Sequence, residues 1–173
     1  MNNSPESLSF PQAIATTQAL MNQINANELS EPEVQQRVLS ILSSKNGGRG
    51  FFVAYLTSEM SLADNPSLGV LAGLKSAEET SSELLVKNLA MSSAMVVIHS
   101  QNNDLESVVG SQKVCQRTCN LIQQLNLQLV EKELQGLQNT LKDGRGEYQD
   151  FLEHWNYNTE QKKAIQETVS SLG

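Results

Sequence analysis

Positive charge is the first thing that this sequence has little of. Its 173 residues include 12 Lys and Arg against 19 Asp and Glu, which gives a net charge of -7 at pH 7. The longest run of basic residues is the pair Lys162–Lys163, whereas nucleic acids and anionic membranes are bound through larger basic patches. We therefore expect neither nucleic acid nor a membrane among the partners.

Aromatic residues are scarce as well. Phe, Tyr and Trp together make up 5% of the chain, so the core must consist mainly of Leu, Val, Ile, Met and Ala. Sandwiches and barrels favour β-branched and aromatic side chains. The composition therefore favours helices.

Cysteines and long apolar runs are also few. Cys115 and Cys119 are too few to form a disulfide framework. The longest apolar stretch, Leu89–Ile98, contains two serines and is shorter than the roughly 20 residues that cross a bilayer. The N-terminus has neither the basic residues nor the apolar run of a signal peptide. These absences predict a reduced, cytoplasmic protein, and we expect no cofactor.

Helical periodicity is what the sequence does contain. Apolar residues recur at spacings of three and four along the chain, and residue patterns typical of capping boxes mark helix starts at Ser9, Ser30, Ser76 and Asn103. The pattern predicts an all-α, compact bundle of about six to eight helices. We expect residues 1–8 to form a flexible tail and residues 9–173 a single helical domain.

Two stretches allow alternatives. Residues 51–60 begin with a continuous apolar run that suits a buried strand or a helix. The 3–4 spacing within the set Phe52, Tyr55, Leu56 and Met60 favours the helix. Residues 104–142 form either one long helix or a helical hairpin that turns near Asn126. We favour the hairpin, because a single helix of that length would need a partner.

Two Gly-Arg-Gly motifs are the most distinctive polar feature. Exposed backbone N–H groups and a forked guanidinium beside a helix start suit a phosphate or a carboxylate. Neither motif matches a phosphate-binding loop or a dinucleotide fingerprint, and two glycine helix ends with solvated arginines are the alternative. The candidate anion-binding residues are Gly48, Arg49, Gly50, Gly144, Arg145 and Gly146.

A heptad-like stripe of apolar residues lies on the predicted helix that ends at the second Gly-Arg-Gly motif. Such a stripe serves either as core within one chain or as a seam between two chains. Together with two aromatic residues it gives the candidate interaction surface: Leu127, Val130, Leu134, Leu137, Leu141, Phe51 and Trp155.

Metal and catalytic sites are not favoured by the sequence. Cys115 and Cys119 could complete a zinc set with His99 and His154, but the histidines are single and distant. The two cysteines are better interpreted as small core residues. No serine-hydrolase motif is present, so we expect no metal and no catalytic residue, and we lean against an enzyme.

The sequence thus predicts a non-catalytic interaction or scaffolding module that acts as a homodimer and binds an unidentified protein partner. The alternative is a helical bundle that binds a small anion near Arg49 or Arg145. A metal-binding or enzymatic bundle is the third and least favoured hypothesis.

Overall fold

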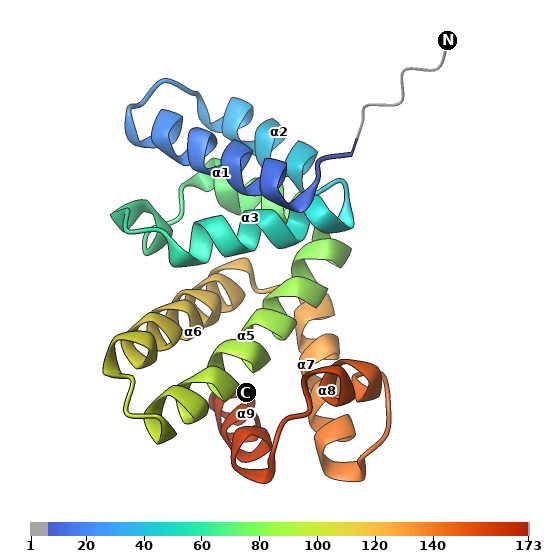
Figure 1. Ribbon diagram of the computed structural model, residues 1–173. Helices are drawn as coiled ribbons and strands as arrows, with labels where there is room; N and C mark the ends of the chain where they lie inside the picture. Colours follow the sequence, from blue (N-terminus) through green and yellow to red (C-terminus); the bar gives the residue numbers. More distant parts are fainter. Residues whose placement is uncertain (1–6, 173) are drawn as a thin grey trace. The chain divides into compact units, whose positions relative to one another are not determined.

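The computed structural model describes residues 7–172, and within this range all regular structure is helical. The all-α prediction is confirmed, and the described residues form nine α-helices. They are α1 (Phe10–Asn25), α2 (Glu31–Ile41), α3 (Lys45–Thr57), α4 (Leu68–Ser76), α5 (Glu78–Gln101), α6 (Leu105–Leu125), α7 (Gln128–Asp143), α8 (Gln149–Trp155) and α9 (Thr159–Ser171), with a short 3-10 turn at Ser61–Ala63 (Figure 1).

The chain forms two compact units. Unit 1 spans Met1–Leu84 and unit 2 spans Leu85–Gly173, so the boundary falls within α5. In unit 1, α1 packs against α3 and α2 packs against α4, whereas in unit 2 α7 packs against α9. Most of the predicted tail, residues 1–6, lies outside the described residues, and the single domain over 9–173 stays a prediction.

Side-chain caps fix several helix starts. Capping boxes are present at Ser9 and Ser30, as the sequence predicts, and a third is present at Asn158. The predicted cap at Ser76 is wrong, because Ser76 is the last residue of α4 and its hydroxyl donates to the carbonyl of Ala72. The predicted cap at Asn103 is wrong by one residue, since Asp104 accepts from the backbone N–H of Ser107.

The first glycine-rich stretch does not end a helix. α2 ends at Ile41, and α3 begins at Lys45 with Ser44 as its cap. Gly48 and Gly50 are therefore buried residues within α3. The predicted helix end at this position is wrong. These glycines are used for close packing inside α3, where their neighbours leave no space for a side chain.

Gly50 shows why glycine is required there. A Cβ at Gly50 would lie 2.5 Å from the Cβ of Ala13 and 2.9 Å from the carbonyl oxygen of Phe10, both on α1. Helix α3 can pack this closely on α1 only where it lacks a side chain. Glycine often ends a helix, but here its lack of a side chain allows two helices to pack closely.

The structure settles both stretches for which the sequence allows alternatives. Residues 51–57 are helical and continue α3, while Ser58–Met60 leave the helix. The stretch 104–142 is a helical hairpin, because α6 ends at Leu125 and Asn126 adopts the left-handed conformation with φ 48°. This is the break that the sequence favours.

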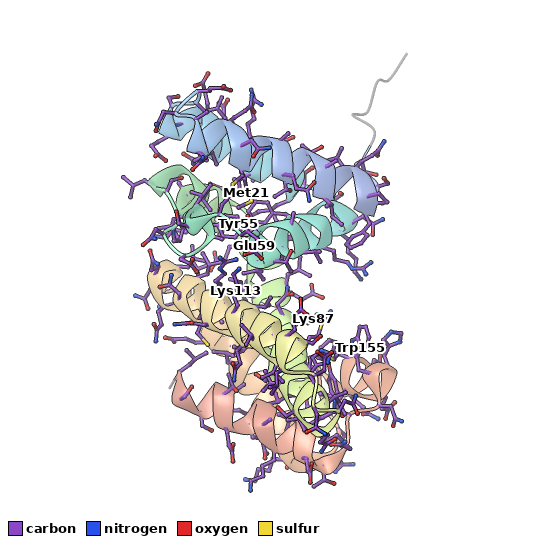
Figure 2. All side chains as sticks on the ribbon, turned by 60° about the vertical axis from the view of Figure 1, so that its left-hand side comes forward. Met21, Tyr55, Glu59, Lys87, Lys113 and Trp155 are labelled. Atoms are coloured by element: carbon purple, nitrogen blue, oxygen red, sulfur yellow. The ribbon has the colours of Figure 1, made fainter. Side chains whose placement is uncertain are left out.

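Each unit buries its own set of apolar side chains. Unit 1 contains an aromatic cluster in which the rings of Phe51 and Tyr55 stack with centroids 5.5 Å apart, and Tyr55 donates to the carbonyl of Leu62 at 3.1 Å. Met21 and Tyr55 lie in the interior of this unit (Figure 2). Unit 2 buries mainly aliphatic residues: Leu85, Val86, Leu89, Leu121, Leu125, Val130, Leu137, Ile165 and Val169.

Helix α5 is long and apolar enough to cross a membrane by length and composition, and within the described residues it alone passes this test. Its most apolar window has a mean hydropathy of 1.2, and 56% of that window is buried inside the protein. Burial of this extent is compatible with the core helix of a soluble protein.

The close approach of α1 and α3 leads to a first prediction. Replacing Gly50 with Ala should destabilise the protein by about 1–3 kcal/mol, because the added methyl group overpacks the contact with Ala13. Chemical unfolding followed by far-ultraviolet circular dichroism would measure this loss.

Gly110 provides the matched control. It lies in α6, and a Cβ built on it has nothing within 4 Å. Gly110→Ala should therefore raise stability by up to about 1 kcal/mol through helix propensity alone. Equal effects of the two substitutions would contradict the packing role of Gly50.

Candidate functional site

A pocket lies between α1 and α2 in unit 1. It encloses about 750 Å³ and is contained within this unit. The capping boxes at Ser9 and Ser30 fix where its two walls begin. We call it the α1–α2 pocket, and its lining residues are Ser7, Leu8, Thr16, Ala19, Leu20, Gln23, Gln36, Arg37, Ser40, Ile41, Ser43 and Ser44.

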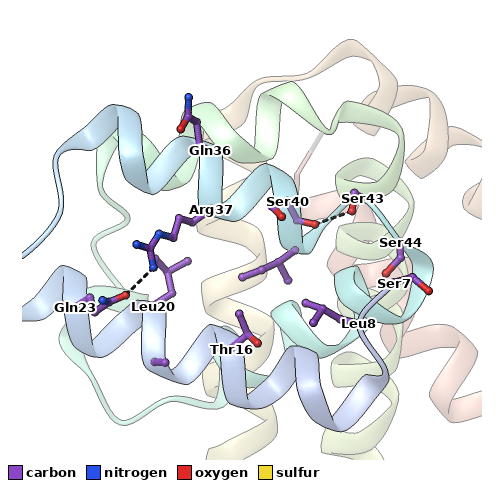
Figure 3. A pocket seen from close by; sticks show the side chains of 12 residues that line it. Ser7, Leu8, Thr16, Leu20, Gln23, Gln36, Arg37, Ser40, Ser43 and Ser44 are labelled. Carbon is purple, nitrogen blue, oxygen red and sulfur yellow. Dashed lines mark hydrogen bonds between the residues drawn. The ribbon is translucent and has the colours of Figure 1, made fainter. Parts of the chain in front are cut away.

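The lining separates apolar from polar groups. Leu20 of α1, Ile41 of α2 and Leu8 of the preceding segment contribute aliphatic surface, while hydroxyl groups surround it. Figure 3 shows Leu8 and Ser44 toward one end of the pocket and Arg37 toward the other. A ligand with an apolar body and one charged end would match this arrangement.

Arg37 is the charged residue of the lining. Its Nη1 donates to Oε1 of Gln23 at 3.1 Å, which joins α2 to α1 at this end of the pocket (Figure 3). A guanidinium carries five N–H donors, so a hydrogen bond to a neutral amide still permits it to bind an anion.

Glu33 lies one turn before Arg37 and is engaged elsewhere. Its carboxylate accepts from the backbone N–H of Ser30 at 2.8 Å and from the Ser30 hydroxyl at 2.9 Å. These hydrogen bonds are the main reason why the pKa of Glu33 lies below its usual value, and the charge of Arg37 contributes least. The nearest acid on α2 therefore serves the helix start.

The first Gly-Arg-Gly motif is not the predicted anion-binding loop. Arg49 lies on the exposed side of α3, with its guanidinium carbon 5.2 Å from the centre of the Phe10 ring. The flanking Gly48 and Gly50 are buried inside the helix. Their backbone N–H groups belong to helical turns and cannot form a loop around a ligand, so the loop interpretation is wrong here.

The second motif does lie outside a helix. Gly144 ends α7 with φ 74°, and Gly146 has φ 147°, so both adopt conformations that favour glycine. Arg145 between them is exposed. A cavity of about 160 Å³ beside this turn is lined by Gly144 but not by Arg145, and a role for Arg145 in binding stays a prediction.

The predicted interaction surface is divided between interior and exterior. Phe51, Val130 and Leu137 are buried, so these three cannot contribute to an exposed surface, and that part of the prediction is wrong. Leu127, Leu134 and Leu141 are partly exposed. Trp155 is 48% exposed on α8, with its ring edge-on to His154 (Figure 2).

The cysteine pair lies in unit 2 on one side of α6. Both cysteines are partly buried and unpaired by disulfide, and the sulfur of Cys115 lies 3.7 Å from the hydroxyl of Ser93 on α5. Ser93 also donates to Thr168 of α9 at 3.0 Å. Cys115 therefore lies beside a polar contact between α5 and α9.

The two thiols differ in acidity. The pKa of Cys115 is lowered to about 6, chiefly by a hydrogen bond with Cys119 and also by the hydroxyls of Ser93 and Ser92, while burial opposes the shift. The same hydrogen bond, with burial, raises the pKa of Cys119 well above the usual range. Cys115 is thus the group that ionises first.

The histidines lie apart from this pair. His99 is in the last turn of α5, with its Nδ1 3.9 Å from a carboxylate oxygen of Asp104, and His154 is on α8. No group of three or more His, Cys, Asp or Glu residues capable of holding a metal occurs among residues 7–172.

Sequence reasoning missed Arg37 and the α1–α2 pocket. The apolar spacing of α2 correctly identifies Val34, Val38 and Ile41 as buried, and Arg37 is then merely an exposed charge beside that face. Its partner Gln23 is 14 residues earlier in the chain. No local pattern indicates that these two residues meet, because packing in space brings them together.

Comparison with known proteins gives a family but no activity. The family model described as "Uncharacterised conserved protein UCP020893" matches residues 9–172. No curated protein and no solved structure matches the chain.

The acidity of Cys115 gives a second prediction. In the reduced, metal-free protein, alkylation of Cys115 by iodoacetamide should reach half its maximal rate near pH 6, because the thiolate that reacts is present above its pKa. Cys119→Ala removes the strongest stabilising hydrogen bond and should shift the profile upward. Mass spectrometry of tryptic peptides would assign each modification.

Cys115→Ala serves as the control. The remaining Cys119 loses the neighbouring sulfur but stays partly buried, so it should react slowly below pH 8, roughly the range of an ordinary thiol. Two cysteines that titrate together in the ordinary thiol range would contradict the hydrogen-bonded arrangement.

Proposed function

The chain belongs to the family of uncharacterised conserved protein UCP020893, and since that description states no activity, we propose a function from the geometry of unit 1. We propose that the protein is a non-catalytic binding module that takes a small amphipathic anion into the α1–α2 pocket. The observation that supports this most directly is the position of Arg37 at one end of a cavity whose other lining residues are uncharged.

The size of the pocket suits a small molecule. Ligand pockets typically enclose about 300–1,000 Å³ and combine apolar walls with a few polar groups that fix orientation. The α1–α2 pocket, at about 750 Å³, has both features. Leu8, Leu20 and Ile41 would cover an aliphatic body and remove it from water.

Arg37 would select the charged end. A guanidinium binds carboxylates and phosphates through two parallel N–H donors. Gln23 already holds the side chain against α1 through the hydrogen bond at 3.1 Å, so part of the conformational entropy is lost before the ligand arrives. The expected ligand class is therefore a medium-length aliphatic carboxylate or phosphate.

The lining favours binding over catalysis. Four serines and one threonine line the pocket, but the lining includes no His, Asp, Glu, Lys or Cys. A serine hydroxyl needs an adjacent base to act as a nucleophile. A reduced cytoplasmic setting, which the two free cysteines favour, completes the proposal.

Binding of decanoate gives the third prediction. The wild-type chain should bind decanoate in isothermal titration calorimetry, and Arg37→Gln should weaken binding by about tenfold or more, because a charge-assisted hydrogen bond is lost. Ser40→Trp, which fills the pocket, should abolish binding.

Two controls separate charge from apolar contact. Arg145→Gln changes an exposed arginine of unit 2 and should leave decanoate binding unchanged. Decanol lacks the anionic end, so its weaker binding should not respond to Arg37→Gln. Absence of any heat with decanoate, and likewise with decyl phosphate, would overturn the proposal, and equal binding by the Arg37 variant would remove Arg37 from it.

A homodimer is the second candidate function, and two exposed residues favour it. Leu105 and Val109 lie one turn apart at the start of α6 and are 74% and 63% exposed. Apolar side chains at this spacing form a strip on one side of a helix. A second copy of the chain would cover this strip and offer its own in return.

Solution mass gives the fourth prediction. Light scattering after size exclusion should show a mass near twice the 19.0 kDa of one chain, and Leu105→Glu with Val109→Glu should return it to the monomer. Val53→Glu is the matched control, since Val53 is 40% exposed on α3 of unit 1. A wild-type mass of one chain would contradict the dimer.

A further inference from the structure

The two cysteines of α6 hold their sulfur atoms on the same side of the helix. Cys115 and Cys119 are four residues apart in a continuous helix, so their side chains lie on one side, one turn apart. Both are partly buried and neither is in a disulfide. The hydroxyl of Ser93 lies 3.7 Å from the Cys115 sulfur.

The helix keeps the two thiols from joining. A disulfide requires a particular separation and direction of the two Cβ atoms, and residues four apart in a regular helix point in nearly the same direction. Oxidation to a disulfide would have to distort α6. The fold therefore holds two thiols close together without allowing them to bond to each other.

The surroundings supply hydroxyls and, among the described residues, no third His, Cys, Asp or Glu ligand. Ser92 and Ser93 of α5 are buried beside the pair, and Ser93 bonds to Thr168 of α9 at 3.0 Å. The described residues provide no set of three His, Cys, Asp or Glu ligands. Tetrahedral zinc and iron–sulfur clusters need four ligands, so the pair does not suit them.

We propose that Cys115 and Cys119 form a two-coordinate site for a soft monovalent cation, Cu(I), held between two sulfur ligands from one helix. Thiolates suit Cu(I), zinc and iron–sulfur clusters. Of these, Cu(I), as a filled-shell ion, accepts two ligands in an almost linear arrangement. This site lies in unit 2 and does not depend on the pocket of unit 1.

Binding joins two thiolates to one metal ion. The two sulfurs each form a bond to Cu(I), and any proton that a sulfur still carries passes to solvent. Copper stays in the same oxidation state, and the complex carries one negative charge. The hydroxyl of Ser93, which now bonds to the carbonyl of Leu89 at 2.7 Å and to Thr168, can turn its proton toward the Cys115 sulfur and stabilise that charge.

Competition with a chromophoric Cu(I) chelator tests the site. The reduced, full-length chain should take one Cu(I) per chain under anaerobic conditions, as counted by native mass spectrometry. Cys115→Ser and Cys119→Ser should each weaken binding roughly a hundredfold or more, since each removes one of the two ligands. Ser93→Ala, which keeps both sulfurs, should weaken it about tenfold.

Other sulfur atoms and other metals provide the controls. The chain contains five methionines, and Met95 is 38% exposed, so Met95→Leu should leave Cu(I) binding unchanged. Zn(II) should not bind stoichiometrically, because two ligands do not complete its coordination. Circular dichroism would verify that each variant keeps its helices.

Three outcomes would overturn the site. They are stoichiometric Cu(I) binding by the chain that lacks both cysteines, full affinity with either cysteine alone, and one Cu(I) shared by two chains. A further measurement uses the unmodified protein: Cu(I) should protect both cysteines from alkylation at equal levels. Protection of one cysteine alone would also reject the paired site.

Discussion

The absence of side chains where helices meet is the constraint on which unit 1 depends. Gly50 allows α3 to contact the backbone of α1, and Gly73 performs the same role between α4 and α2, where an added Cβ would lie 2.6 Å from the Cβ of Val38. These two helix pairs pack tightly. Helices α1 and α2 pack against each other less extensively, and the α1–α2 pocket occupies the space left between them.

The two candidate sites offer chemically different groups in a chain with few aromatic residues. In unit 1, one arginine at the end of an apolar pocket offers charge and direction. In unit 2, two sulfurs and a serine hydroxyl offer soft ligands in a polar contact between helices. Each arrangement is complete within its own unit, so each can be tested without the other.

Local signals were sufficient for most of the fold. The caps at Ser9 and Ser30 act through bonds within four residues, and the break at Asn126 follows from one residue that tolerates a left-handed backbone. Such features depend on the chain beside them and can be predicted from sequence. The pocket could not be predicted, because Gln23 and Arg37 meet only after α1 and α2 have taken their places.

The errors at the glycines have one physical cause. Glycine tolerates positive φ and also permits close approach, and the sequence does not say which property is used. In this chain, asparagine serves most left-handed positions: Asn27, Asn103, Asn126 and Asn156 all have positive φ, whereas among the described glycines only Gly144 and Gly146 do.

Asparagine follows the ends of several helices, and four of the described glycines, Gly48, Gly50, Gly69 and Gly73, lie at contacts between helices. That division explains why identical Gly-Arg-Gly motifs have opposite structures. The motif at 48–50 lies inside a helix because its glycines contact α1 and α5, and the motif at 144–146 ends one because both its glycines have positive φ. A short motif therefore predicts an anion-binding loop only when the packing of its glycines is known.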